Sequence, residues 1–226
     1  MAADAIFSKE TFKFFRELGR NNHKAWMDEN RHRYRSLVVE PFRKLLDCVG
    51  PAAQKLNRQF VVSGRTGDNF SRINRDIRFA ADKSPYRGHM YLHFAEPGAE
   101  GGQLYAGISA EAATSGFRIY GMSKESPLAQ IARPRGRDNA KWIEGQRRRL
   151  GKKYDSYWYA SEKGEWTKHN GWPAKPEDWK KIQGWVVRKK FAATAATRAS
   201  FPRDITAIFR DVYPLYEFTT SPRWKK

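Results

Sequence analysis

Five basic residues lie within the short segment 71–87, in which charged and apolar side chains are closely mixed. Its charged residues are Arg72, Arg75, Asp76, Arg78, Asp82, Lys83 and Arg87. Apolar neighbours such as Ile73 and Ile77 favour a position against the core, where a guanidinium is tolerated only beside a carboxylate or a bound anion. Two carboxylates cannot neutralise five cations, so two interpretations stay open. One is an ion-pair network that fixes a loop to a sheet, with Arg75 and Asp76 as central partners. The other is a pocket whose Arg side chains bind a phosphate or carboxylate.

The same segment resembles a known family. The run Arg72-Ile-Asn-Arg-Asp-Ile-Arg-Phe-Ala-Ala-Asp-Lys-Ser-Pro-Tyr-Arg87 is similar to the signature of domain of unknown function 2461, and Asn21-Asn-His-Lys-Ala-Trp26 is similar to its second motif. The resemblance runs from about Phe7 to Tyr120, with later similarities at 171–173 and 213–216. It implies a shared fold and a site at these motifs, but no known activity. The candidate ligand-binding residues are Arg72, Arg75, Asp76, Arg78, Asp82, Lys83, Tyr86, Asn21, Asn22 and Trp26.

The composition indicates a folded and strongly basic protein. Across 226 residues, 43 Lys and Arg against 24 Asp and Glu give a net charge of +19. Such a charge attracts polyanions, including nucleic acid. The length suits one domain, 1–226, in which 7–125 carries the motifs and 126–226 forms a basic, helical, Trp-rich part. No secretory signal or membrane span is recognisable, so we expect a cytoplasmic protein with no membrane partner. Without such a signal, the glycosylation pattern at Asn69 is treated as chance.

The first third of the chain has helical periodicity. Apolar residues recur through 8–18 behind the capping residue Ser8, and Gly19 ends that helix. A second apolar stripe starts behind Asn22, which we expect to cap the helix, and ends at Gly50-Pro51. Pro41 should kink or split this helix near Val39. If one asparagine of the Asn21-Asn22 pair caps the helix, the other is free to point elsewhere; alternatively both only build the turn, and the sequence leaves both possibilities open.

Alternating side chains then predict strands. Residues 88–94 alternate cleanly, 104–109 form the returning strand of a hairpin, and 116–120 form a third, so 70–120 should fold as an antiparallel meander. On a strand, His89 and His93 lie roughly 13 Å apart and cannot share one metal ion. We therefore expect no metal site.

The remaining residues combine basic and aromatic side chains. A helix is predicted from about 139 to 150, capped by Asp138, after a short helix at 126–133. The densest polyanion-binding candidates are Arg147, Arg148, Arg149, Lys152 and Lys153. Between 154 and 185, Trp and Tyr alternate with Lys, which suits either single-stranded nucleic acid or the core of an irregular subdomain. Further helices are predicted at 176–197 and 202–212.

These patterns predict an α+β fold, with N-terminal helices packed on an antiparallel meander and a helical, Trp-rich C-terminal part. We favour binding of a small anionic ligand by segment 71–87, with or without catalysis. Nucleic-acid binding by the basic C-terminal half and a purely structural role are the alternatives. No catalytic triad, zinc-ligand spacing or dinucleotide fingerprint can be assembled, and no cofactor is expected.

Overall fold

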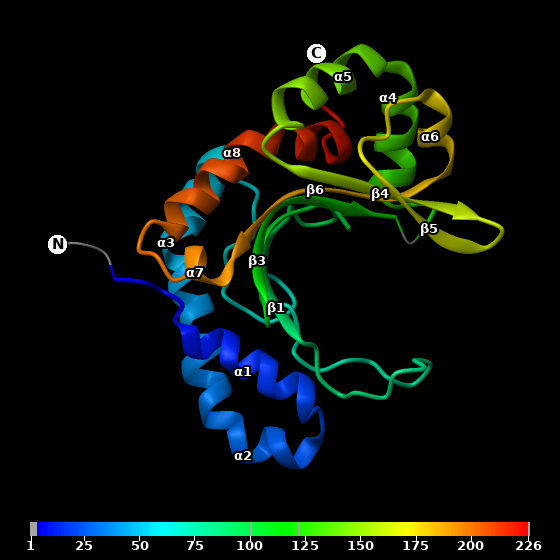
Figure 1. Ribbon diagram of the computed structural model, residues 1–226. Helices are drawn as coiled ribbons and strands as arrows, with labels where there is room; N and C mark the ends of the chain where they lie inside the picture. The colour runs from blue at the N-terminus through cyan, green and yellow to red at the C-terminus, as the bar shows by residue number, and fades with distance from the viewer. Residues whose placement is uncertain (1–3, 100, 122, 226) are drawn as a thin grey trace. The chain divides into compact units, whose positions relative to one another are not determined.

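The computed structural model describes residues 4–99, 101–121 and 123–225 (Figure 1). Its helices are α1 (Lys9–Arg20), α2 (Lys24–Tyr34), α3 (Glu40–Leu56), α4 (Arg133–Asp138), α5 (Ala140–Leu150), α6 (Pro176–Lys181), α7 (Ala193–Ala196) and α8 (Phe201–Thr220). The π-helical turns are η1 (Arg35–Val39) and η2 (Leu128–Ala132). The strands are β1 (His89–Phe94), β2 (Gln103–Ser109), β3 (Ala112–Tyr120), β4 (Asp155–Glu162), β5 (Glu165–Asn170) and β6 (Ile182–Ala192). The predicted α+β class is confirmed.

The strands form one antiparallel sheet in the order β1-β2-β3-β6-β4-β5. The first three strands follow one another as the predicted meander, and β6 is inserted between β3 and β4. Strand β4 pairs with β5 on one side and with β6 on the other, so that Trp158 lies opposite Trp185 and Tyr157 opposite Val186. The hairpin formed by β4 and β5 extends the sheet in a part of the chain for which the sequence predicted no strand.

The chain divides into two compact units. The first unit contains the described residues up to Phe94 together with Ala106–Thr114 and Phe191–Thr206, and the second contains Ala95–Tyr105, Ser115–Lys190 and the rest from Ala207. Aromatic rings fill both cores. In the first unit Phe7 packs against Phe42 and Phe201, and in the second Trp185 packs against Phe117 and Trp179.

The N-terminal helices follow the predicted periodicity, and three of their ends differ from the prediction. Helix α1 starts directly after Ser8, as expected, but it continues through Gly19 to Arg20, so the end predicted at Gly19 is wrong. The cap of α2 is His23, whose Nδ1 accepts the Trp26 N–H at 3.3 Å, and not Asn22. A π-helical turn at 35–39 separates α2 from α3 just before Pro41, which confirms the predicted interruption. The end predicted at Gly50-Pro51 is wrong, because α3 continues through Pro51 to Leu56.

The C-terminal half contains the main errors of the prediction. The helix predicted at 176–197 is a short α6 followed by the long strand β6 and the single turn α7. The predicted cap Asp138 is the last residue of α4, and Asn139 precedes α5 instead. The helix predicted to end near Arg133 continues as α4, and α8 runs beyond 212 to Thr220.

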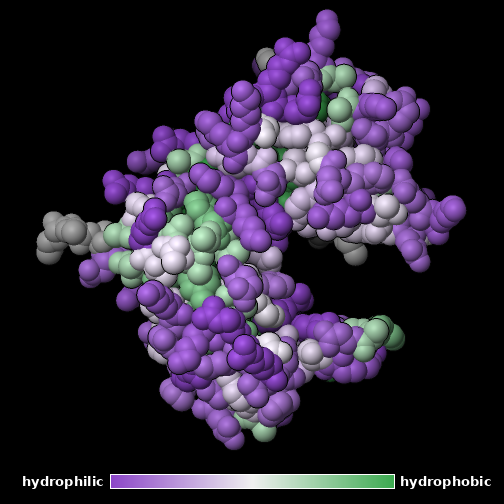
Figure 2. Space-filling model, in the orientation of Figure 1, coloured by the Kyte–Doolittle hydropathy of each residue, from purple (hydrophilic) through white to green (hydrophobic). Residues whose placement is uncertain are grey.

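Hydrophilic residues cover most of the face seen in Figure 2, in keeping with the large net charge. Among the residues that the structure describes, no helix is long and apolar enough to cross a membrane.

Candidate functional site

Residues 71–87, called here the Arg-rich loop, form a hairpin-like projection between α3 and β1 (Figure 1). Two backbone hydrogen bonds join its arms: the Arg75 N–H donates to Pro85 O and the Arg87 N–H to Ile73 O, each at 2.8 Å. Ser71 anchors its base, because its Oγ accepts the Tyr91 N–H at 2.9 Å. The tip carries Phe79, which is 96% exposed, and Figure 2 shows hydrophobic side chains at the end of this projection.

Both acids of the Arg-rich loop form ion pairs within the loop itself. Arg75, whose side chain is 25% exposed, pairs with Asp82, and Arg78 forms two hydrogen bonds to Asp76, at 3.0 and 2.7 Å. The central pairing of Arg75 with Asp76 is therefore wrong, because the hairpin places Asp82 across from Arg75. Hydrogen bonds from Ser84, and then the contact with Arg75, lower the pKa of Asp82.

The remaining cations of the loop differ in their surroundings. The Lys83 ammonium donates to the carbonyls of Ile77 and Arg78, at 3.1 and 3.4 Å, and so closes the tip. Arg72 and Arg87 are exposed, and within the described part of the chain neither makes an ion pair. The loop therefore keeps a surplus of positive charge at these two positions.

The two asparagines before α2 have separate tasks. The Asn21 Nδ2 donates to Glu17 O at 2.9 Å and finishes α1. The Asn22 side chain clamps the Tyr86 backbone: its Nδ2 donates to Tyr86 O at 2.8 Å, and its Oδ1 accepts the Tyr86 N–H at 3.0 Å. One asparagine of the pair thus reaches away from its own turn, and it is Asn22, which we expected to cap α2. Trp26 packs against Phe14, with ring centroids 5.6 Å apart.

A cavity of about 350 Å³, called here the loop cavity, lies where α1 and α2 meet the Arg-rich loop. It is lined by Gly19, Asn22, Arg75, Asp82, Ser84, Tyr86, Arg87, Gly88 and His89. Four predicted site residues meet here, namely Asn22, Arg75, Asp82 and Tyr86, while the other six do not line the cavity. The candidate set omitted Arg87 although the same run contains it, because the sequence does not show which arginines the hairpin turns inward.

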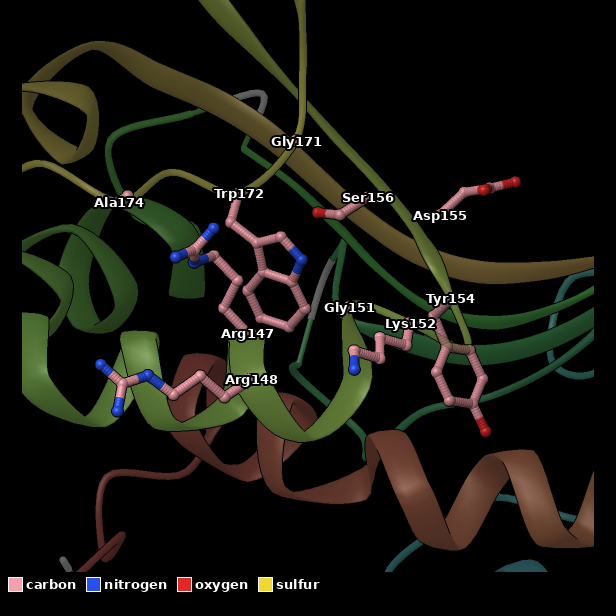
Figure 3. Close-up of a pocket in the computed structure, with 10 residues that line it drawn as sticks. All are labelled: Arg147, Arg148, Gly151, Lys152, Tyr154, Asp155, Ser156, Gly171, Trp172 and Ala174. Atoms are coloured by element: carbon pink, nitrogen blue, oxygen red, sulfur yellow. The ribbon is translucent and has the colours of Figure 1, made fainter.

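A second and larger cavity lies in the second unit, between α5, the start of β4 and the segment after β5. Its volume is about 790 Å³, and we call it the basic pocket. It is lined by Arg147, Arg148, Gly151, Lys152, Tyr154, Asp155, Ser156, Gly171, Trp172 and Ala174. In Figure 3 the Trp172 indole stands in the middle of the pocket with Arg147 beside it, while Arg148 and Asp155 point away. Arg149 and Lys153, the other two predicted polyanion-binding residues, do not line it.

Neighbouring groups fix the side chains of the basic pocket. Glu144 accepts hydrogen bonds from Arg147 at 2.6 and 2.9 Å and from Arg148 at 3.0 Å. These two guanidinium groups lower the pKa of Glu144 to about 2, so it is ionised at neutral pH. The Tyr154 hydroxyl donates to Asp211 at 2.7 Å. Burial, and then the contact with Asp211, raise the pKa of Tyr154, so it is a neutral donor.

A buried tryptophan, Trp179, fixes the segment that carries Trp172 through a hydrogen bond. The Trp179 Nε1 donates to Pro173 O at 2.8 Å, and Trp172 itself contacts Trp185, with ring centroids 5.2 Å apart. In the sequence, Trp172 belongs to a Gly-Trp-Pro run and to the aromatic residues of 154–185 that suit either single-stranded nucleic acid or a subdomain core. No local pattern indicated that it would meet Arg147 from α5.

Within residues 4–99, 101–121 and 123–225, no three His, Cys, Asp or Glu side chains are grouped so that they could hold a metal ion. His89 lines the loop cavity, whereas His93 is buried in β1.

The chain matches the model of a known protein family. The model of the family described as "Conserved hypothetical protein (DUF2461)" matches residues 10–218. This range includes the Arg-rich loop, both motif asparagines and every residue that lines the basic pocket. No curated protein matches the chain with significance.

Proposed function

Because the chain belongs to the DUF2461 family, whose description names no activity, its function must be inferred from its own geometry, and we propose that the second unit binds nucleic acid through the basic pocket. The observation that carries this proposal is the meeting of Arg147, Arg148 and Lys152 with the Trp172 indole around one cavity of about 790 Å³. In such a pocket the cations can bind a phosphate while the aromatic ring stacks on a base of the same nucleic acid.

The charges of the pocket support a phosphate-bearing ligand. Glu144 holds Arg147 through its Nε and Nη2 atoms and Arg148 through its Nε atom, which leaves further guanidinium N–H groups on both residues for a ligand. A guanidinium oriented in this way loses less conformational entropy when it forms a paired hydrogen bond with a phosphate. The loop cavity suits a nucleotide less well, because its volume is about 350 Å³ and none of the described residues that line it is a tryptophan. We therefore place nucleic-acid binding ahead of the small-anion hypothesis that the sequence favoured.

Salt dependence tests the role of the basic pocket. Each phosphate contact contributes about −0.9 to the slope of log affinity against log salt on duplex DNA, because a counterion is released. The double variant Arg147→Gln/Lys152→Gln should flatten the slope of the wild type by about 1.8. The measurement is fluorescence anisotropy with labelled DNA over a series of salt concentrations.

Lys141→Gln is the matched control for this experiment. Lys141 is an exposed cation on the same helix α5 but does not line the pocket. If its removal flattens the slope as much as the removal of a pocket residue, the affinity comes from general charge and not from the pocket. A wild-type protein that binds no nucleic acid even at low salt would refute the proposed function.

A second candidate function, the binding of a small anion in the loop cavity, is favoured by Arg87. This exposed arginine lines a polar cavity beside the Arg75–Asp82 pair and makes no ion pair of its own within the described residues. A phosphate or carboxylate there would complete its hydrogen bonding, and Ser84 and His89 line the same cavity. Without an anion, the surplus charge makes the site self-repelling.

Thermal unfolding in phosphate tests this second candidate. At matched ionic strength, phosphate should raise the melting temperature of the wild type above its value in chloride, because a ligand that binds only the folded state stabilises it. Arg87→Gln should remove this rise, whereas Arg43→Gln, at an exposed position on α3, should keep it. Equal melting temperatures of the wild type in the two salts would contradict anion binding in the loop cavity and would indicate that the Arg-rich loop has a purely structural role.

A further inference from the structure

Four aromatic rings gather on one face of the sheet in the second unit. They belong to Tyr120 on β3, Tyr157 and Tyr159 on β4, and Trp166 on β5. Tyr159 lies 6.3 Å from Tyr120 and 5.9 Å from Trp166, and Tyr120 stacks on Trp166 with an interplanar angle of 17°. Tyr157 adds an edge contact to Tyr159 at 5.8 Å. We call this group the aromatic face.

The register of the strands brings these rings together. Tyr159 is paired with Lys168 on β5 and with Gly184 on β6, and successive side chains of a strand alternate between the faces. Gly184 supplies the space for Tyr120, because a Cβ at this position would lie only 2.5 Å from the Tyr120 ring. The glycine in β6 thus allows a ring of the neighbouring strand to lie across the sheet.

The opposite face of the same strands already forms the core of the unit. Trp158 and Trp185 are directly paired there and buried, and α6 covers them through Trp179, which lies 5.5 Å from Trp185. None of the described residues covers the edge of the aromatic face in this way, since Trp166 is 45% exposed. The three tyrosines are half-buried. A large exposed tryptophan beside partly exposed tyrosines is typical of a binding surface.

Cations stand among these rings. The Lys168 Nζ lies 4.4 Å from the centre of the Tyr157 ring, and the Arg188 guanidinium carbon lies 5.0 Å from it. Both distances are within the range of cation–π attraction. The face therefore offers stacking surfaces and positive charge side by side.

We propose that the aromatic face stacks the unpaired bases of single-stranded nucleic acid, whose phosphates meet Lys168 and Arg188. The inference rests on the proposed nucleic-acid function and names its substrate class. The bases of a duplex are already stacked on one another and cannot lie on protein rings, whereas every base of a single strand has an accessible face. A neutral ligand such as a sugar could also stack on the rings, but it carries no negative charge to pair with Lys168 and Arg188. The two cations therefore favour a nucleic acid as the ligand.

The experiment compares a labelled oligothymidylate with a duplex of the same length. Trp166→Ala should weaken binding of the single strand about fivefold to tenfold, the lower part of the range for stacking of one base on an aromatic ring, and should leave duplex binding unchanged. Its salt slope should equal that of the wild type, because no charge is removed. Lys168→Gln should instead flatten the single-strand slope by about 0.7.

Phe79→Ala is the matched control, because it removes another exposed ring beside an arginine, Arg78, in the first unit. The inference is overturned if Trp166→Ala binds the single strand within about twofold of the wild type, or if Phe79→Ala weakens it equally. In both cases the proposed function stands as long as the wild type binds nucleic acid and the basic-pocket variant flattens the slope. If the wild type binds neither strand form, the proposed function fails and this inference fails with it.

Discussion

Replacing Asn69 with alanine should lower the free energy of unfolding by about 3–5 kcal/mol, because one buried side chain satisfies four backbone groups. The Asn69 Oδ1 accepts the N–H groups of Ser63 and Gly64, at 2.9 and 3.0 Å. Its Nδ2 donates to the carbonyls of Val61 and His93, at 2.7 and 3.1 Å. Asn69 is fully buried, so alanine would leave these groups without partners and water could not replace the amide.

Urea unfolding of the Asn69→Ala variant beside Asn74→Ala measures this effect. Asn74 lies on the Arg-rich loop with an exposed side chain, and its loss should change stability by no more than about 0.5 kcal/mol. If Asn69→Ala unfolds within about 1 kcal/mol of the wild type, the four hydrogen bonds do not hold this part of the first unit together. The buried amide also explains why the glycosylation pattern at Asn69 has no meaning in the folded chain.

The sequence predicted the elements that a local periodicity defines. Helix α1 and strands β1 and β2 were recognised because apolar residues recur at the period of a helix or of a strand with one buried face. Strand β6 was predicted as part of a helix at 176–197. Its run Gly184-Trp-Val-Val187 contains two β-branched residues, which favour a strand, and all four of its residues are buried. The insertion of β6 between β3 and β4 is a long-range pairing that no local pattern shows.

For the candidate sites too, the sequence did not show contacts that depend on how the chain folds back on itself. The sequence brought Asn22 and Arg75 into one hypothesis through the two motifs, and both line the loop cavity. It could not predict that Arg75 pairs with Asp82, since that pairing depends on how the hairpin folds back. The basic run of α5 was correctly marked as charged, but the meeting of Arg147 with Trp172 requires the packing of two segments that are far apart in the chain.

Gly136→Ala and Gly145→Ala should change stability in opposite directions, although both add one methyl group to a helix of the second unit. A Cβ at Gly136 in α4 would lie 2.0 Å from the Trp179 ring, which is only 1% exposed and cannot move away. Such overpacking costs about 1–3 kcal/mol and occasionally more. A Cβ at Gly145 in α5 would meet no atom within 4 Å. Alanine there should stabilise the protein by about 0.4–1 kcal/mol, because it restricts the unfolded chain and favours the helix.

The Gly136→Ala variant also tests whether the packing of the core of the second unit affects the basic pocket. Displacement of Trp179 would break its hydrogen bond to Pro173, the residue that follows Trp172. We therefore expect Gly136→Ala to weaken nucleic-acid binding at a temperature at which the variant is still folded, and Gly145→Ala to leave binding unchanged. Urea unfolding gives the two stability changes, and anisotropy with labelled DNA gives the affinities. Loss of stability in Gly136→Ala with wild-type affinity would show that binding does not depend on the position of Trp172, and the pocket would lose its aromatic partner.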